Sequence, residues 1–347
     1  MQQLKQELEE YSVFADFRAF ALRQIEEATH ADTAFINSLS ARLGRQIFWS
    51  ERHTFYEALD LLEQGTFIDE ALAQAAKFHS GDEKLIKTLC LGVLRIGFSS
   101  TSSLLNFGLS GSSGVGKTSA LRTVCGLLPQ DRVTILNSVS PKVLQFKTLN
   151  EQGVSDPDYY KGRCILINEI NDTSNKRYDG LKALAETSQD DAIIHQTTSG
   201  GKAKDLVIRG ERCVMIASVK APQDPQIQSR LVEFTLPKED AAARVSKARL
   251  SCANILSEAK LSTDPKTKVI QAGYELLLSD PSKFAKPSSE VKAYADRVCA
   301  ESAAMMSTRR IKQALAFAQC IAASLTYKRG ERVLTVDDLA AAFALLA

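Results

Sequence analysis

The stretch that most constrains the fold of this chain is an eight-residue run, GSSGVGKT, which extends from Gly111 to Thr118. Its spacing, G-x-x-x-x-G-K-T, is that of a phosphate-binding P-loop. Glycines let backbone N–H groups turn toward a phosphate at the start of a helix. An apolar run at residues 104–109 precedes the loop, and a helix-like run at 119–124 follows it. This order predicts a strand, a loop and a helix, and it argues against a chance match in a Gly/Ser-rich turn.

The P-loop pattern assigns a role to each of its residues. We expect the Lys117 ammonium to reach the β- and γ-phosphates of a nucleotide and the Thr118 hydroxyl to ligate Mg²⁺. The predicted nucleotide-binding residues are Gly111, Ser112, Ser113, Gly114, Val115, Gly116, Lys117, Thr118 and Ser119.

Composition places the chain among ordinary globular proteins, with 44% hydrophobic and 24% charged residues. No apolar run is long enough to span a bilayer, and the N-terminus lacks the apolar core of a signal peptide, so we expect a cytoplasmic protein without a membrane partner. The seven cysteines are scattered without a C-x-x-C pair and the four histidines are isolated, which argues against a structural zinc site. Because the net charge is only +2, nucleic-acid binding would need a local basic surface.

Hydrophobic periodicity divides the chain into three parts. Residues 1–95 are predicted to be an N-terminal helical domain, with a new helix starting at Asp32. Residues 96–237 alternate strands and helices, which predicts an α/β P-loop core with a parallel sheet. Residues 238–347 are predicted to be an α-helical lid domain, in which Ser307 and Thr335 are each placed to cap a helix.

A strand predicted at 164–167 is followed by Asn168 and Glu169. P-loop ATPases place two acids at such a strand end, where the first holds Mg²⁺ through water and the second polarises the attacking water. Glu169 is therefore the candidate catalytic base, with an exposed strand-end glutamate as the alternative. Asn168 is the candidate metal partner, although its amide brings no charge. Ser218, at the end of the next core strand, is placed to sense the γ-phosphate or to align the attacking water.

Two further strands, predicted at 192–196 and 205–209, enclose a flexible turn at 197–204. The pattern predicts a hairpin with a basic tip. Lys202 and Lys204 in this turn are candidate contacts to nucleic-acid phosphates, with a solvated surface hairpin as the alternative.

The order of these motifs resembles that of the AAA+ ATPases. The chain looks most like the branch that holds the minichromosome-maintenance helicases and magnesium chelatases, whose members carry an extra hairpin where residues 192–209 lie. The end of the chain, STRRIKQALAFAQCIAASLTYKRGERVLTVDDLAAAF, is similar to the lid of those helicases. The segments ILNSVSPKVLQF, GRCILINEIND and QIQSRLVEFTL resemble helicase modules of phage and mobile-element replication proteins, but the chain shows no zinc-finger primase motif. The resemblance covers residues 100–345.

The resemblance implies an ATP hydrolase that uses ATP with Mg²⁺ and acts as a closed homo-oligomeric ring, expected to be a hexamer. Arg230 would be an arginine finger that reaches the γ-phosphate of a neighbouring subunit, with a surface salt-bridge arginine as the alternative. Arg309 would be a lid arginine that senses the same phosphate, with Arg310 as the alternative register.

The function implied is an ATP-driven DNA helicase or translocase in phage or mobile-element replication. Single-stranded DNA would pass through the channel, where Lys202 and Lys204 would grip it, and a primase or other replication protein is an expected partner. Two alternatives share the nucleotide site. A chelatase-like remodeller would act on a protein client, and a helicase loader would use ATP only as a switch, which Asn168 favours.

Overall fold

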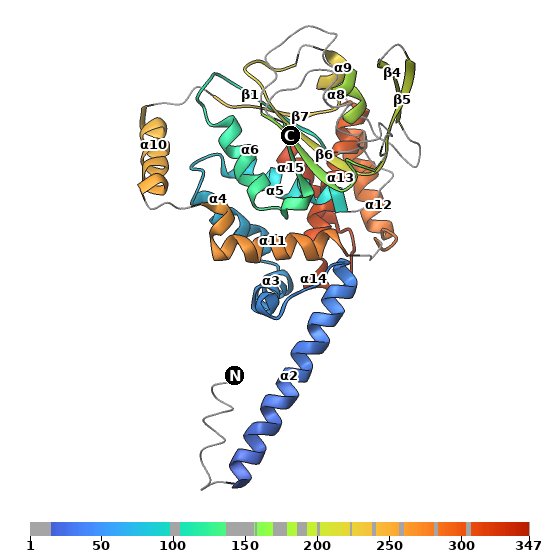
Figure 1. Cartoon of the computed structure of the whole chain (residues 1–347). Helices are drawn as coiled ribbons and strands as arrows, with labels where there is room; N and C mark the ends of the chain where they lie inside the picture. The colour runs from blue at the N-terminus through green and yellow to red at the C-terminus, as the bar shows by residue number, and fades with distance from the viewer. Residues whose placement is uncertain are drawn as a thin grey trace. The chain divides into compact units, whose positions relative to one another are not determined.

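A computed structural model of the chain describes residues 15–97, 105–136, 156, 158–168, 179–185, 193–199, 202–222, 224–237, 241–256, 260–280, 284–302 and 307–346. The chain divides into two compact units, residues 1–57 and 58–347. Figure 1 labels the helices and strands along the chain. Within the described segments, no helix combines the length and the apolar character needed to cross a bilayer.

The first unit is helical, and its long helix runs without a break through Asp32. The Asp32 carboxylate accepts a hydrogen bond from the Tyr56 hydroxyl (2.9 Å) and pairs with Arg52 Nε at 3.2 Å, while the Phe35 ring stacks on Tyr56. The prediction that a helix restarts at Asp32 was wrong because side chains from the following helix engage this carboxylate, which is therefore not a helix cap. The elements are α2 (Ala15–Leu43), η1 (Trp49–Glu51) and the start of α3 (Arg52–Gln64).

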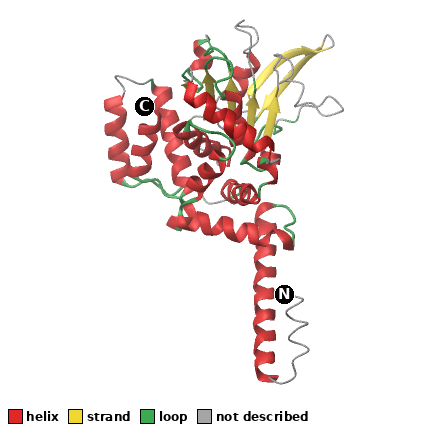
Figure 2. Cartoon of the chain, turned by 90° about the vertical axis from the view of Figure 1, so that its left-hand side faces the viewer, coloured by secondary structure: helices red, strands yellow, loops and turns green. Residues whose placement is uncertain are grey.

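The second unit is built on a five-stranded sheet with the order β2-β3-β6-β1-β7. Figure 2 draws the strands in yellow and the helices in red. Each neighbouring pair is parallel, so the carboxyl ends of all five strands lie at one edge. This confirms the α/β P-loop fold with a parallel sheet. The strands are β1 (Phe107–Ser110), β2 (Val133–Leu136), β3 (Arg163–Ile167), β6 (Arg212–Ala217) and β7 (Val232–Thr235).

Helices cover both faces of this sheet. On one face, α6 (Lys117–Gly126) packs on β3 and β6, and Cys125 of α6 meets Cys164 of β3. The next residue of β3, Ile165, points to the opposite face, where a buried cluster joins the sheet to α8 (Asp179–Leu184) and α9 (Pro225–Gln228). Burial on both faces explains why the central strands are continuous apolar runs instead of alternating ones.

The helices after the sheet pack against the helices before it. α11 packs on α4 and η2, and α13 packs on η2, α5 and α15. Two buried hydrogen bonds join these segments: Gln74 Nε2 donates to Thr267 Oγ1 (2.8 Å), and the Tyr274 hydroxyl donates to the Cys90 carbonyl (2.9 Å). The three-part division at residues 95 and 237 stays a prediction. The elements are α4 (Phe67–Ala76), α5 (Glu83–Gly92), η2 (Val93–Gly97), α10 (Ala241–Leu256), η5 (Leu261–Thr263), α11 (Pro265–Leu278), α12 (Ser289–Ser302), α13 (Thr308–Ser324), α14 (Thr326–Arg329) and α15 (Val336–Leu346).

Both helix caps predicted in the C-terminal part are confirmed. Ser307 Oγ accepts a hydrogen bond from the Arg310 backbone N–H at 3.3 Å, at the start of α13. Asp338 Oδ2 accepts from the Thr335 backbone N–H (2.9 Å), and Thr335 Oγ1 accepts in return from the Asp338 N–H (3.3 Å). This reciprocal pair satisfies backbone donors that the start of α15 would otherwise leave unpaired.

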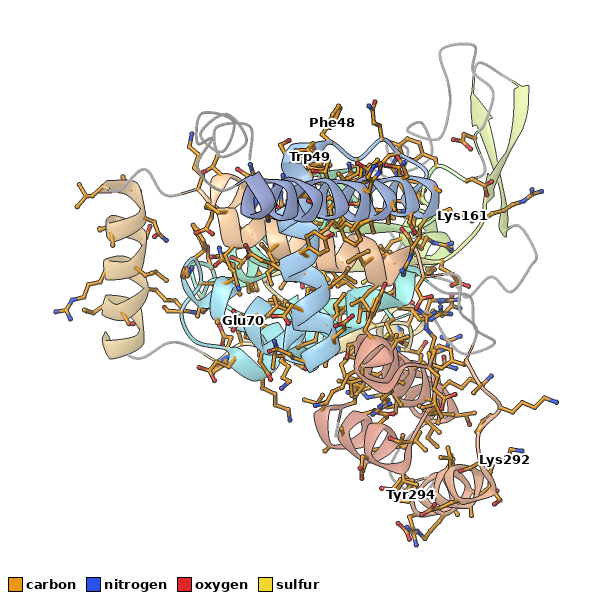
Figure 3. The ribbon with its side chains drawn as sticks, turned by 90° about the horizontal axis from the view of Figure 1, so that it is seen from below. Phe48, Trp49, Glu70, Lys161, Lys292 and Tyr294 are labelled. Atoms are coloured by element: carbon orange, nitrogen blue, oxygen red, sulfur yellow. The ribbon has the colours of Figure 1, made fainter. Side chains whose placement is uncertain are left out.

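The predicted hairpin forms a separate two-stranded antiparallel sheet, β4 (Ile193–Ser199) and β5 (Lys202–Ile208). Figures 1 and 3 show it standing apart from the main sheet. The ladder runs further than expected, since Lys202 pairs with Ser199 and Lys204 pairs with Thr197. Both lysines therefore belong to β5 and not to a flexible turn, because the strands pair up to a two-residue connection. The two connecting glycines, 200 and 201, lie outside the described residues.

The buried Tyr274 hydroxyl gives the first testable prediction. Tyr274→Phe removes the donor to the Cys90 carbonyl in a core where water cannot replace it, so we expect a loss of about 1–2 kcal/mol of unfolding free energy. Urea denaturation measures this. The matched control is Tyr294→Phe on α12, a half-buried ring beside Arg297, labelled in Figure 3, for which we expect less than about 0.5 kcal/mol. Equal effects of the two substitutions would show that the Tyr274 bond does not hold the helices together.

Candidate functional site

The P-loop connects β1 to α6, as the sequence predicted. Gly111 has φ +147° and Gly116, which caps α6, has φ +91°, and these are conformations that side chains other than glycine rarely adopt. A Cβ on Gly111 would also lie 2.8 Å from the Leu236 carbonyl oxygen. The two glycines are therefore required by the backbone path between strand and helix.

Lys117 stabilises this loop by hydrogen bonds to its backbone. Its ammonium donates to the Gly111 and Ser112 carbonyls, both at 2.8 Å, and the residue is only 8% exposed. The ammonium lies in the loop that leads into the N-terminus of α6, which carries the positive end of the helix dipole. A fixed cation beside such a helix start makes a site for an anion.

Asn168 meets the first turns of α6 where β3 ends. Its carbonyl accepts from the Thr118 hydroxyl at 3.5 Å, and its side-chain Oδ1 accepts from Arg122 Nε at 3.4 Å. Mg²⁺ takes oxygen ligands, and the Thr118 hydroxyl and the Asn168 amide oxygen are of that kind, so these residues fit the ion, although neither is a carboxylate. Within the described segments, no group of three or more His, Cys, Asp or Glu side chains could hold a metal ion. Glu169 lies outside the described residues.

Ser218 lies between the P-loop and Asn168, because β6 separates β1 from β3 in the sheet. Its backbone N–H donates to the Leu109 carbonyl (2.9 Å), and its side chain is buried at the carboxyl edge. A pocket of about 310 Å³ brings together half of the predicted site residues. It is lined by Ser113, Gly114, Gly116, Lys117, Thr118, Ser119, Asn168, Ala217, Ser218 and Val219.

Arg230 and Arg309 are not part of this pocket. Arg230 lies two residues before Val232, the residue of β7 that pairs with Phe107 at the start of β1, and the Arg230 carbonyl accepts from Asn106 Nδ2 at 3.5 Å. Arg309 donates to the hydroxyl of Ser229 at 2.6 Å. The two arginines therefore lie together at the amino edge of the sheet, with the length of β1, about 13 Å, between that edge and the P-loop.

Arg309 and Arg310 have different hydrogen-bond partners, and which of them senses a phosphate stays a prediction. Arg310 is half-buried and donates to the Leu346 carbonyl at 2.8 Å, and burial lowers the pKa of its guanidinium. Arg309 is the one that reaches the segment of Arg230.

The short helix before Arg230 is anchored by Asp224. Its carboxylate caps α9 through the Gln226 N–H (2.8 Å) and pairs with Lys182 Nζ at 2.8 Å. The hydrogen bond from Lys182 lowers the pKa of Asp224 below its ordinary value. Arg230 itself donates to the Gln226 carbonyl, so this cap fixes the segment that presents the arginine.

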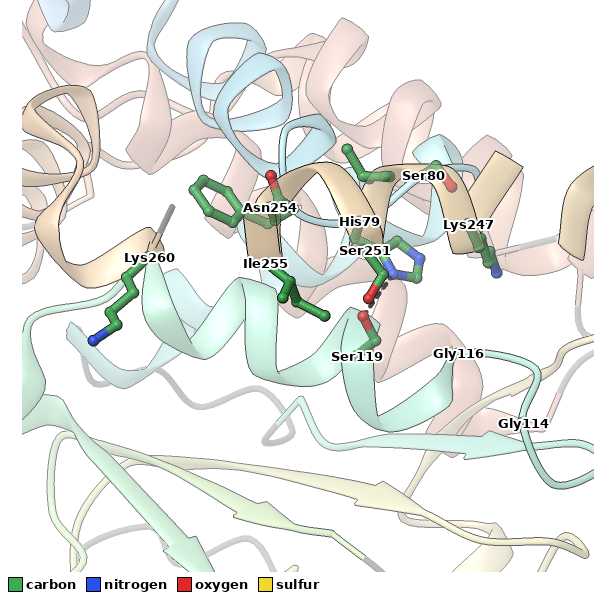
Figure 4. Close-up of a pocket in the computed structure, with 12 residues that line it drawn as sticks. His79, Ser80, Gly114, Gly116, Ser119, Lys247, Ser251, Asn254, Ile255 and Lys260 are labelled. Atoms are coloured by element: carbon green, nitrogen blue, oxygen red, sulfur yellow. Dashed lines mark hydrogen bonds between the residues drawn. The ribbon is translucent and has the colours of Figure 1, made fainter. Parts of the chain in front are cut away.

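A second group of polar residues beside the P-loop was missed from the sequence. His79 hydrogen-bonds with Ser119 Oγ (3.2 Å) and with Asp82 Oδ2 (3.1 Å). Lys247 of α10 donates to the Val115 carbonyl (3.1 Å) and to Asp82 Oδ2 (3.4 Å). In the sequence, this group is marked only by a polar run before α5, and that run indicates a break between two helices. Figure 4 shows His79, Ser119 and Lys247 around a second pocket, described below.

The parallel sheet, the glycine loop after β1 and the buried lysine at the start of α6 together define a P-loop nucleotide-binding fold. Residues 53–258 match the family described as "MTBMA_p00010 P-loop domain", and the chain belongs to this family. The chain is 25% identical over 238 residues to "Uncharacterized protein MTBMA_p00010" of Methanothermobacter marburgensis. That alignment covers 67% of this chain and 27% of the relative, so the chain spans about a quarter of that protein's length.

Asn168 gives a prediction about the metal. Asn168→Asp adds a carboxylate beside the Thr118 hydroxyl, so we expect the Mg²⁺ concentration needed for half-maximal nucleotide binding to fall about tenfold, equivalent to about 1.4 kcal/mol. A fluorescent nucleotide titrated at fixed free Mg²⁺ concentrations measures this. Thr118→Ala, which removes a metal ligand, is expected to shift the same curve in the opposite direction. An unchanged Mg²⁺ dependence in Asn168→Asp would show that this position does not face the ion.

Proposed function

We propose that this protein is an ATP-driven motor, a ring-shaped DNA helicase or translocase whose ATPase sites are completed between subunits. One observation carries the proposal. Arg230 and Arg309 lie together at the amino edge of the sheet, whereas the P-loop lies at the carboxyl edge. An arginine side chain is shorter than the roughly 13 Å of β1 between the two edges. If these arginines act on a nucleotide, they act on the nucleotide of another copy of the chain.

A site divided in this way requires a head-to-tail interface. Such interfaces close into rings when the rotation between subunits permits, and they otherwise form open filaments. The resemblance to AAA+ ATPases supports a closed ring, with a hexamer as the expected size.

The chemistry assigned to each group follows from charge and position. In one subunit, Lys117 would hold the β- and γ-phosphates and Glu169 would orient the attacking water. In the neighbour, Arg230 would stabilise the charge that develops on the transferred phosphoryl group, with Arg309 sensing the same phosphate. Mg²⁺, held by the Thr118 hydroxyl and through water by Asn168, would neutralise phosphate charge. Ser218 is buried between these groups, where it would report whether the γ-phosphate is present.

The β4–β5 hairpin is the proposed DNA contact. Lys202 and Lys204 occupy alternate positions of β5 next to the turn, in an element that stands apart from the main sheet. Contacts to backbone phosphates bind single strands without reading their sequence. Concentrating lysines on one protruding hairpin reconciles DNA binding with a net charge of only +2. The resemblance to phage and mobile-element helicase modules supports a role in replication, with a primase as a partner.

The divided site predicts complementation between inactive subunits. Lys117→Ala removes the phosphate cation and Arg230→Ala removes the finger, so each variant alone should lose at least about 1000-fold in ATP turnover. In a random one-to-one mixture, a P-loop and an arginine finger that are both intact meet at about a quarter of the head-to-tail interfaces, so turnover should recover toward that fraction. Steady-state phosphate release measures this.

The control for complementation is Arg249→Ala, an exposed arginine on α10, which should keep full activity alone. Native mass spectrometry verifies that the mixed rings contain both subunits. Verified mixed rings without recovered turnover would contradict a site shared between subunits.

The hairpin predicts that single-stranded DNA stimulates ATP hydrolysis. Replacing Lys202 and Lys204 with alanine together should abolish that stimulation and weaken DNA binding at least tenfold, while leaving basal hydrolysis unchanged. Fluorescence anisotropy with a labelled oligonucleotide and phosphate release measure the two effects. Lys292→Ala with Lys328→Ala is the matched double control. An ATPase that is indifferent to DNA would instead indicate a remodeller with a protein client.

A second candidate, an ATP-switched loader, is favoured by the position of Asn168. Its side chain accepts from Arg122, so neither partner there supplies the negative charge that holds a metal most tightly. A switch would bind ATP without turnover. Steady-state hydrolysis that Glu169→Gln abolishes would remove this candidate.

A further inference from the structure

A second pocket, of about 650 Å³, lies beside the P-loop pocket and beneath α10 (Figure 4). The two pockets share Gly114, Gly116 and Ser119, so they adjoin at the P-loop. Its lining comes from the stretch before α5, the P-loop with the start of α6, one side of α10, and Lys260 just before η5. The remaining residues are Phe78, His79, Ser80, Lys247, Leu250, Ser251, Asn254, Ile255 and Lys260.

Lys247 contacts the P-loop directly. A Cβ built on Gly116 would lie 3.0 Å from Lys247 Nζ, and this ammonium donates to the Val115 carbonyl inside the loop. The helix that carries Lys247 is otherwise highly exposed, with Ile255 at 72% and Leu256 at 85%. Its attachment here depends on polar contacts with the loop and with the segment before α5, such as the bond from Asn254 Nδ2 to the Lys77 carbonyl.

Asp82, which accepts a hydrogen bond from Lys247, has a left-handed backbone conformation. It has φ +60° and ψ +30°, and among the described residues it is the one non-glycine with positive φ. This conformation costs on the order of 1 kcal/mol, and such strain concentrates at functional sites where other contacts maintain it. Here it accompanies a carboxylate that contacts both His79 and Lys247.

We propose that the pocket beneath α10 binds the nucleoside part of a nucleotide whose phosphates lie on the P-loop, and that Lys247 donates to one of those phosphates. The inference rests on the nucleotide binding in the proposed function. A phosphate oxygen is a stronger acceptor for the Lys247 ammonium than the neutral carbonyl of Val115. His79 and Asp82 are positioning residues, since His79 bonds to Ser119 of α6 and Asp82 bonds to Lys247.

The lining suits a nucleoside in its chemistry. Phe78, Leu250 and Ile255 offer apolar surface to the faces of a planar base, and Ser251 and Asn254 offer hydrogen bonds to ring nitrogens or ribose hydroxyls. Inorganic tripolyphosphate has the same phosphates as ATP but no nucleoside. Comparing the two ligands therefore separates this pocket from the P-loop.

The first test fills the pocket. Ser251→Trp should weaken ATP binding at least tenfold and leave tripolyphosphate binding unchanged, as measured by titration calorimetry with Mg²⁺. The matched control is Leu256→Trp, which adds an indole to an outward position of the same helix and should change neither affinity. Unchanged tripolyphosphate binding also shows that the filled variant is folded.

The second test removes the proposed phosphate contact. Lys247→Ala should weaken both ATP and tripolyphosphate about tenfold, whereas Arg249→Ala on the same helix should weaken neither. Loss of ATP affinity alone, or no loss at all, would overturn the role of Lys247.

The outcomes distinguish a failure of the nucleoside pocket from a failure of nucleotide binding itself. A wild-type protein that binds neither ATP nor tripolyphosphate would overturn nucleotide binding, and this inference with it. A wild-type protein that binds both ligands equally, or a Ser251→Trp variant with unchanged ATP affinity, would leave the P-loop site standing and overturn the nucleoside pocket.

Discussion

The direction of the parallel sheet is the constraint on which the rest of the structure depends. Register along β1 places the P-loop and Ser218 at the carboxyl edge, and the same register with β7 places Arg230 at the amino edge. β1 pairs in parallel with both β6 and β7, so the residues before these strands lie at one edge and those after them lie at the other. The separation between phosphate loop and arginines is therefore a property of the fold and does not depend on loop conformation.

Helices that follow the sheet bring a cation to each of its edges. α10 carries Lys247 to the P-loop, and α13 carries Arg309 to Ser229. α11, between them in the chain, is joined to the earlier helices by the buried Tyr274 bond to Cys90. The C-terminal helices therefore share a core with the helices that precede the P-loop, which positions them relative to both edges.

The sequence predicted those features that depend on contiguous residues. The P-loop, the apolar central strands and the cap at Ser307 follow from local spacing, and all are present. The continuous helix through Asp32 was not predicted, because the side chains that engage its carboxylate come from a later helix. Lys247 was missed for the same reason, since it lies 132 residues beyond the Val115 carbonyl that it contacts and nothing in its own helix marks it.

Because Asn168 is neutral, the site has one negative charge fewer than it would have with an acid at this position. Lys117, Arg122 and Lys247 bring three cationic side chains to the P-loop and the first turns of α6, and Asp82 lies against one of them. An excess of positive charge in a partly enclosed pocket attracts a polyphosphate even without a metal. A metal ion, in contrast, is held most strongly by carboxylates. With Asn168 in place of an acid, the site lacks one such carboxylate. In the proposed site, a polyphosphate would therefore be held less through Mg²⁺ and more by the protein's own cations, so the contact of Lys247 with the loop would matter more than it would beside an acidic pair.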